Sequence, residues 1–252
     1  MVHPSDADRQ SVGFGSYTHA MGLDIYVGTF SRYYQRDWLT VVQQAFPDQT
    51  QMVFADPPPT DPASDDDIRA AIAQWSSQLA QGLTVESISR EDPAAPYFTD
   101  KPAWDGYGGL VLWAAYDDQS VAPADRCATV TTDSWSQEPV LQRYATPPKA
   151  LRYPQLLLGI ELWLPISGPS VFRTLDPAGN QRMFGNCSKL LAELDLLNQR
   201  TWRADTATRD RWRYEGLEHG SSLESAARFG WSVMHCLATE AVQHQLPIIL
   251  DY

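Results

Sequence analysis

The sequence predicts a single α+β domain with a central mixed β-sheet flanked by about four helices. Two observations lead to this prediction. Short runs rich in β-branched and aromatic residues are interspersed with apolar residues at helical spacing, and neither a repeat nor a linker divides the chain. With 252 residues, 43% of them hydrophobic, the chain can form one sizeable core. We assign residues 21–252 to the domain and interpret residues 1–20 as a disordered leader, so that Met21 is a candidate natural start.

The first half of the chain predicts one strand and two helices. Residues 22–28 form a β-branched and aromatic run between glycines, which indicates a buried strand. Residues 35–46 carry apolar side chains at helical spacing and predict a helix. After the stiff prolyl loop 56–62, a second helix begins at Ser64, because Ser64 and Asp67 form a capping pattern before an apolar stripe.

The middle of the chain is less regular. Residues 110–116 are apolar throughout, and a run this short does not separate a helix from a buried strand. Residues 156–164 are the best strand candidate in the chain. The turn-forming residues 176–180 predict a hairpin between strands at 171–175 and 181–184.

Two helices and a strand are expected to close the domain. Residues 188–199 place four leucines on one stripe, which predicts an amphipathic helix. Ser221 and Glu224 form a capping box that opens a longer helix. Residues 248–252 follow a proline and predict a terminal strand.

Composition excludes several classes of protein. The formal net charge is −12, which argues against nucleic acid as the main partner. No stretch is apolar enough to span a membrane, and residues 1–20 lack the apolar core of a secretory signal. The chain has three widely spaced cysteines, which argues against a disulfide framework. We therefore expect a cytoplasmic protein.

Acidic residues stand in or beside apolar strand candidates. Asp24, Glu161 and Asp251 do so, and Asp105 lies in an aromatic turn-rich segment. A carboxylate at such a position needs an ion pair, hydrogen bonds or a place at the sheet edge, because burying it alone is costly. We favour this structural interpretation of the four acids.

The alternative interpretation of these acids is an enzyme, most simply a hydrolase. If the strand acids converged, Asp24 or Asp251 would act as base or as ligand of a divalent cation, with Glu161 as partner. Trp104 and Tyr107 would line the substrate site. The sequence lacks a GxxxxGK[ST] loop, a GxSxG turn, an HExxH motif and a CxxC pair. No cofactor and no metal site are predicted.

The second notable feature is a segment whose charged residues are all acidic, which we call the one-signed segment. Seven aspartates and no basic residue lie between positions 37 and 68: Asp37, Asp48, Asp56, Asp61, Asp65, Asp66 and Asp67. The stretch from Asp56 to Asp67 could form a docking face that attracts a basic protein. A solvated acidic surface that keeps the protein in solution is the plainer alternative.

Nine tryptophans are the third feature. Trp104, Trp113, Trp163 and Trp231 sit in apolar contexts and are expected in the core. Trp38, Trp135, Trp202 and Trp212 have polar neighbours, where aromatic residues often mark a binding surface. They equally suit the edge of a loop-rich core, which we prefer over a carbohydrate-binding or small-ligand surface.

Four segments resemble a group of bacterial proteins that is common in GC-rich genomes. They are the run MGLDIYVG at 21–28, WDGYG at 104–108, GIELW at 159–163 and LPIILDY at 246–252. The resemblance covers residues 21–252 and supports a start at Met21. It implies no activity, because no reaction is assigned to that group.

The sequence thus leaves two functional hypotheses. The first is a non-enzymatic, acidic protein-binding module, such as an immunity or antitoxin-like protein that neutralises a basic partner. It rests on the net charge, the one-signed segment and the missing catalytic motifs. The alternative is the hydrolase that uses carboxylates from strand ends.

Overall fold

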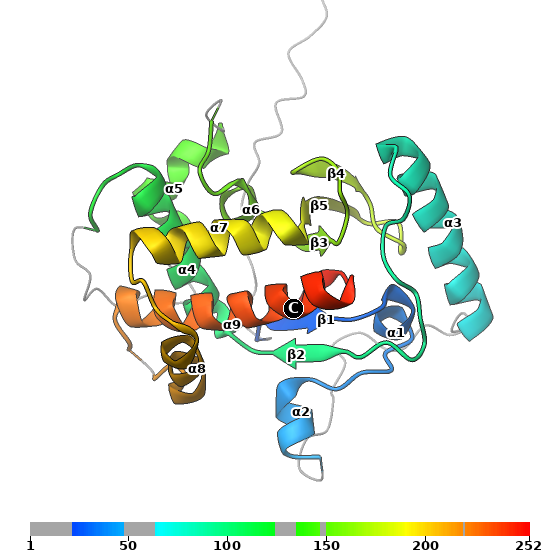
Figure 1. Cartoon of the computed structure of the whole chain (residues 1–252), viewed down its shortest axis with the longest axis horizontal. Helices are drawn as coiled ribbons and strands as arrows, with labels where there is room; N and C mark the ends of the chain where they lie inside the picture. Colours follow the sequence, from blue (N-terminus) through cyan, green and yellow to red (C-terminus); the bar gives the residue numbers. More distant parts are fainter. Residues whose placement is uncertain (1–21, 48–63, 124–134, 147–149, 219) are drawn as a thin grey trace, which may run out of the picture.

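A six-stranded mixed sheet forms the centre of the protein (Figure 1). The computed structural model describes residues 22–47, 64–123, 135–146, 150–218 and 220–252, which form one α+β body as predicted. The strands are β1 (Asp24–Val27), β2 (Phe98–Asp100), β3 (Leu162–Leu164), β4 (Phe172–Leu175), β5 (Gln181–Asn186) and β6 (Ile248–Asp251). Their order is β2-β1-β6-β3-β5-β4; β3 and β5 are parallel, and the other neighbouring pairs are antiparallel.

Helices surround this sheet. They are α1 (Phe30–Tyr34), α2 (Val41–Ala45), α3 (Asp65–Leu83), α4 (Ala103–Asp118), α5 (Pro139–Gln142), α6 (Pro154–Leu157), α7 (Cys187–Arg200), α8 (Thr206–Glu215) and α9 (Leu223–His244), with the 3-10 helices η1 (Trp135–Gln137) and η2 (Arg143–Ala145). In the described chain α3, α4, α7, α8 and α9 have ten residues or more. The helices expected from the sequence include α3, α7 and α9 but neither α4, whose segment was left undecided, nor α8, whose charged sequence buries no residue and gives no apolar stripe.

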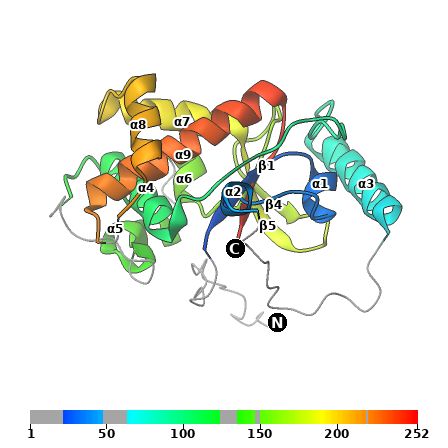
Figure 2. The same ribbon diagram turned by 90° about the horizontal axis from the view of Figure 1, so that it is seen from below.

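The sheet has one core on each face. Helices α4, α7 and α9 pack on one face, and α1 and α3 cover the other (Figure 2). Side chains alternate between the two cores along the central strands: Ile25 and Leu250 belong to the α4 and α9 side, whereas Tyr26 and Ile249 belong to the α1 and α3 side. This alternation fixes the face to which each strand acid projects.

Glycines set the spacing between α4 and α9. A Cβ atom at Gly230 would overlap the carbonyl oxygen of Gly106, and one at Gly109 would lie 2.7 Å from the Cβ of Ala226. The two helices therefore approach backbone to backbone. Residues 106–115 of α4 are all buried, so the helix has no polar face, which explains why periodicity alone left this segment undecided.

Elements with a strong local signal lie where the sequence places them. Strand β1 falls inside the run 22–28, and α3 begins after Ser64, whose side chain and that of Asp67 form the predicted capping box. The hairpin of β4 and β5 closes through Gly179 at φ 84°. Helix α7 and strand β6 also occupy the predicted segments.

Three predicted elements are wrong in part. The helix expected at 35–46 is confined to α2 (Val41–Ala45), because the chain turns after α1 at Arg36, φ 57°, and residues 37–40 are not helical. The strand expected at 156–164 begins only at Leu162, because α6 and Gly159 at φ 63° precede it. The cap of α9 is Ser222, which accepts from the backbone N–H of Ser225, rather than the box at Ser221.

Some predictions concern residues outside the described ranges. The leader 1–20 and the prolyl loop 56–62 belong to this group. In the part of the chain that the structure describes, no helix is both long and apolar enough to cross a membrane.

Candidate functional site

Charged residues gather at one end of the sheet. The register pairs Asp24 with Asp251 across β1 and β6, and Leu162 with Ile249 across β3 and β6. The start of β1, the end of β6 and the start of β3 therefore lie at the same end of the sheet. The end of β2, the start of β5 and the end of β4 lie there too. We call the six residues there the strand-end cluster: Lys101, Asp24, Asp251, Glu161, Arg182 and Asp176.

Asp24 and Asp251 project to the α1 side of the sheet, by the alternation of β1 and β6. Asp24 pairs with the Nζ atom of Lys101 at 3.4 Å, while its buried Oδ1 has no hydrogen-bond partner among the described residues. Burial raises the pKa of Asp24, and Lys101 only partly opposes this. The hydroxyl of Tyr33 donates to Asp251 at 2.6 Å, and burial together with Asp251 raises the pKa of that tyrosine.

Glu161 immediately precedes β3 and links side chains from the two faces of the sheet at this end. Its Oε2 atom accepts from Arg182 and, at 3.2 Å, from the hydroxyl of Tyr252. The Nε atom of Arg182 donates to the buried Asp176 at 3.0 Å. One guanidinium thus bridges two carboxylates, and an ion pair of this kind is a sufficient structural reason for an acid beside an apolar strand.

A cavity of about 40 Å³ lies next to Glu161 on the α4 side. Its walls are Trp104, Tyr107, Val111, Trp135, Leu156, Gly159, Ile160, Glu161, Leu250 and Tyr252. Three of the predicted site residues, Trp104, Tyr107 and Glu161, therefore come together here. Within this lining Glu161 carries the only carboxylate.

The four acids named from the sequence do not share one cavity. Asp24 and Asp251 belong to the α1 side, whereas Glu161 lines the cavity on the α4 side. Asp105 is half-buried in the first turn of α4, beside Trp104 but outside the lining of the cavity. Asp24, Asp251 and Glu161 therefore lie at the same end of the sheet but on different sides of it, and they do not line a common pocket.

The acidic docking residues are described only in part. Asp65, Asp66 and Asp67 form the first turn of α3 and are exposed, which suits the positive end of that helix. Asp66 pairs with the guanidinium of Arg69 at 3.2 Å. Asp56 and Asp61 lie outside the described residues.

All nine tryptophans are described, and none is among the large exposed apolar side chains. Trp113, Trp163 and Trp231 are buried as expected, and so is Trp135, whose neighbours are polar. Trp202 stacks on Trp113 with ring centroids 5.6 Å apart. The described residues thus show no largely exposed tryptophan.

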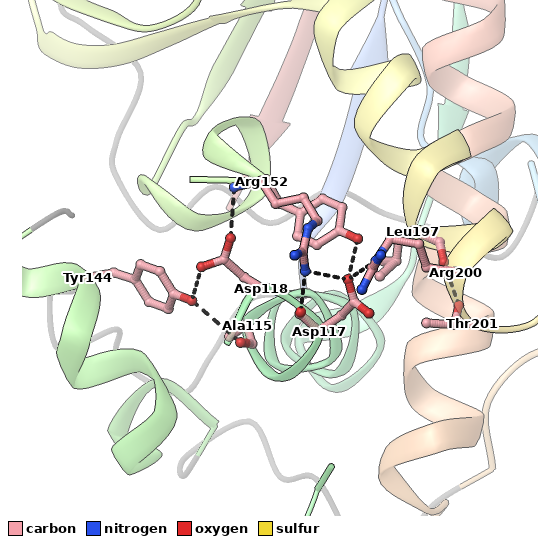
Figure 3. Close-up of polar contacts among 9 residues, drawn as sticks. Ala115, Asp117, Asp118, Tyr144, Arg152, Leu197, Arg200 and Thr201 are labelled. Carbon is pink, nitrogen blue, oxygen red and sulfur yellow. Dashed lines mark hydrogen bonds and ion pairs between the residues drawn. The ribbon is translucent and has the colours of Figure 1, made fainter. Parts of the chain in front are cut away.

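A second polar network joins the end of α4 to α7 and to the segment before α6 (Figure 3). The carboxylate of Asp117 accepts from Tyr153 at 2.5 Å, Arg200 at 2.7 Å and Arg152 at 3.1 Å. Asp118 accepts from the backbone N–H of Arg152 at 2.7 Å. Burial raises the pKa of Asp117, but the bonds from Arg200 and Tyr153 and the charges of both arginines outweigh it and lower the pKa overall. The network offsets two negative charges at a helix C-terminus, which is a structural role.

Glu193 is a further buried acid. Both of its oxygens accept from the backbone N–H of Gln155, at 2.8 and 3.0 Å, so the carboxylate holds the start of α6. Burial raises the pKa of Glu193 to about 8. The amide of Gln155 continues the network to the backbone of Asn186 at 2.8 Å and of Ser170 at 2.8 Å. These bonds are internal, so we assign Glu193 to the architecture of the core.

Sequence reasoning did not find Arg182, Tyr252, Tyr33 or the role of Trp135 at the sheet end. The only available signal was the hairpin turn, which places Arg182 near the start of a strand. Among the described residues, no group of three or more acidic, histidine or cysteine side chains is placed to hold a metal ion. Comparison of the chain with protein-family models, with curated proteins and with solved structures gave no match.

Proposed function

We propose that this protein is an acidic protein-binding module that docks a basic protein partner, with the immunity or antitoxin type as its most concrete form. One observation carries the proposal: three large apolar side chains are exposed within eight residues of the chain, on the segment around α2. Leu39, Val42 and Phe46 are exposed by 45%, 39% and 54%, and we call them the α2 patch. They account for half of the large apolar side chains that are exposed in the described chain.

The burial pattern of α2 is inverted relative to a helix that packs on its own protein. Gln43 is buried, whereas Val42 and Phe46 face solvent. Hydrogen bonds hold the segment to the edge strand β2: the hydroxyl of Thr99 donates to the carbonyl of Leu39 at 3.1 Å and accepts from Gln44 at 2.9 Å. Figure 1 shows α2 beyond β2, away from the helices that cover the sheet. Clustered apolar side chains with a polar surround are typical of docking surfaces.

Charge specifies the kind of partner. The net charge of −12 attracts a basic protein and repels an acidic one over distances comparable to the Debye length. The exposed aspartates at the start of α3 add to this field. We therefore expect the apolar patch to supply affinity and the acidic surface to supply speed and selectivity of association.

The geometry favours binding over hydrolysis by two carboxylates. Such a hydrolase needs an acid and a base that face the same substrate. Glu161 is the only carboxylate in the lining of the cavity, and Asp24 and Asp251 project to the opposite face of the sheet. At this cavity the hydrolase alternative therefore has no second carboxylate to act with Glu161.

The test begins with capture of partners on the immobilised full chain, followed by identification, purification and titration. We expect a basic partner whose affinity falls about tenfold or more in the Val42→Ser/Phe46→Ser variant, because its apolar contacts are lost. Val121→Ser is the matched control, since Val121 is 55% exposed but lies outside the α2 patch. Failure to recover a partner, or equal affinity of both variants and wild type, would contradict the proposal.

A further inference from the structure

The cavity beside Glu161 has a wall of connected aromatic rings. Trp104 contacts Tyr252 and Tyr107 with centroids 5.2 and 6.3 Å apart and ring planes at 66° and 79°. Tyr107 in turn contacts Trp135 at 6.2 Å and 83°. These edge-to-face pairs fix one another, so the wall is preorganised for a ligand.

Glu161 supplies the charge of the cavity. Its Oε2 atom is held by Tyr252 and Arg182, and its side chain keeps 28% of its surface exposed. Trp104, Gly159 and Tyr252 are also only half-buried, which indicates that the cavity opens to solvent on this side. A carboxylate at the rim of an aromatic wall is the combination that binds organic cations, through an ion pair and through the negative faces of the rings.

The charges around the cavity favour a cation over an anion. The ion-paired trio that includes the cavity residue Glu161 consists of Glu161, Arg182 and Asp176, and its formal net charge is −1. The N-terminus of α4 adds a partial positive charge, which the carboxylate of Asp105 in its first turn offsets. Arg182 is already shared between Glu161 and Asp176 and leaves one negative charge of that trio uncompensated.

The size of the cavity limits the ligand. A volume of about 40 Å³ corresponds to the space of about three water molecules. Sites for drug-sized ligands have volumes of about 300–1,000 Å³. The cavity thus admits the head group of a side chain or a compound of a few heavy atoms.

We infer that this cavity binds a cationic group of ammonium or guanidinium chemistry, held by Glu161 and the rings of Trp104, Tyr107, Trp135 and Tyr252. The inference is independent of the proposed docking function, because the cavity shares no residue with the α2 patch. The cation can belong to a free small compound or to a side chain of a protein. Both sources present the same chemistry to the cavity.

The first experiment needs no variant. Tetramethylammonium chloride and tert-butyl alcohol, a neutral compound of similar shape, are titrated into the full chain by calorimetry at equal ionic strength. Guanidinium and urea form a second pair of similar shape. We expect each cation to bind about tenfold or more tightly than its neutral counterpart, because only the cation gains the ion pair and the ring interactions. Equal binding within each pair would overturn the inference.

Variants then locate the site. Glu161→Gln is expected to weaken cation binding about tenfold, and Trp104→Leu about threefold or more. Glu224→Gln is the matched control: Glu224 also pairs with an arginine, Arg228, and its side chain is 24% exposed against 28% for Glu161. Cation binding that persists unchanged in Glu161→Gln would place the ion elsewhere and overturn the assignment.

A last comparison distinguishes the two sources of the cation. An arginine peptide with blocked ends is titrated beside free guanidinium. Tighter binding of the peptide assigns the cavity to a protein side chain, and tighter binding of the free ion assigns it to a small compound. If neither binds more tightly than urea, the cavity does not recognise cations and the inference fails.

Discussion

Asp24 and Asp251 occupy directly opposed positions on the antiparallel strands β1 and β6, so that two carboxylates project to the same face of the sheet. Each has a compensating donor: Lys101 at 3.4 Å from Asp24, and the hydroxyl of Tyr33 at 2.6 Å from Asp251. The pKa of Asp24 is nevertheless raised, first by burial and further by Asp251 and Asp100. This end of the sheet therefore keeps its acids at some cost in stability, which the next prediction addresses.

Removal of the ammonium group of Lys101 should make the burial of Asp24 measurably destabilising. Lys101→Met is expected to lower the free energy of unfolding at pH 7 by about 1–2 kcal/mol, because Asp24 loses its counter-ion. Asp24→Asn in the same chain should recover most of the loss. Urea unfolding of the two single variants and the double variant measures this coupling. Lys189→Met, at an exposed lysine, is the control, and simple addition of the two single effects would contradict the account.

Glu193 predicts a specific dependence of stability on pH. Its pKa is about 8 in the folded protein against an ordinary value of 4.5, so the folded state holds the proton more tightly. The stabilisation is fully present below about pH 4.5 and is lost as the pH rises through 8. Between about pH 5 and 8, wild type should lose up to about 1.4 kcal/mol per pH unit more than Glu193→Gln. Denaturant unfolding at several pH values measures both slopes, and equal slopes would show that Glu193 is ionised.

Asp117 predicts the opposite dependence of stability on pH. Its carboxylate has a lowered pKa, so its stabilisation is present above the ordinary value of 3.8 and is lost as the pH falls through the folded pKa. Asp117→Asn should cost about 2 kcal/mol at pH 7, because charged hydrogen bonds from Arg152 and Arg200 are lost. The difference from wild type should shrink in acid. Asp66→Asn, in an exposed pair, should change stability by less than about 0.5 kcal/mol, and a comparable loss there would count against this explanation.

Two glycines predict opposite effects of the same substitution. Gly230→Ala should lower the free energy of unfolding by about 3 kcal/mol or more, because the new methyl group would overlap the backbone of Gly106. Gly82→Ala in α3 should raise it by about 0.5–1 kcal/mol, since nothing lies within 4 Å of that Cβ position and alanine favours helix. Thermal or denaturant unfolding compares the two directly. A tolerated Gly230→Ala would contradict the close approach of α4 and α9.

Local signals explain which elements the sequence could predict. The Ser64 cap, the turn before Gly179 and the terminal β-branched run each act within a few residues, and α3, the hairpin and β6 lie where they indicate. Helix α4 was undecided because its buried surface carries no polar face. The break at Arg36 depends on one backbone angle, φ 57°, that no residue type in the segment announces.

The candidate site depended on contacts between distant segments. The sequence named Trp104, Tyr107 and Glu161 together, and the cavity contains all three. It could not give the register that opposes Asp24 to Asp251, since strands β1 and β6 lie at opposite ends of the described chain. Nor could it show that Tyr252 and Arg182 meet at one oxygen of Glu161, because that contact follows from the order of the strands.

The most direct test of the proposed function is the association rate constant of the purified partner, measured by stopped flow at low and high salt. A partner attracted by the acidic surface should associate about tenfold or more slowly in ~0.5 M than in ~0.02 M sodium chloride, with a nearly constant dissociation rate. The Val42→Ser/Phe46→Ser variant should instead dissociate faster at both salt concentrations. An association rate that is independent of salt, together with unchanged dissociation from this variant, would contradict the account of an acidic, patch-mediated binding module.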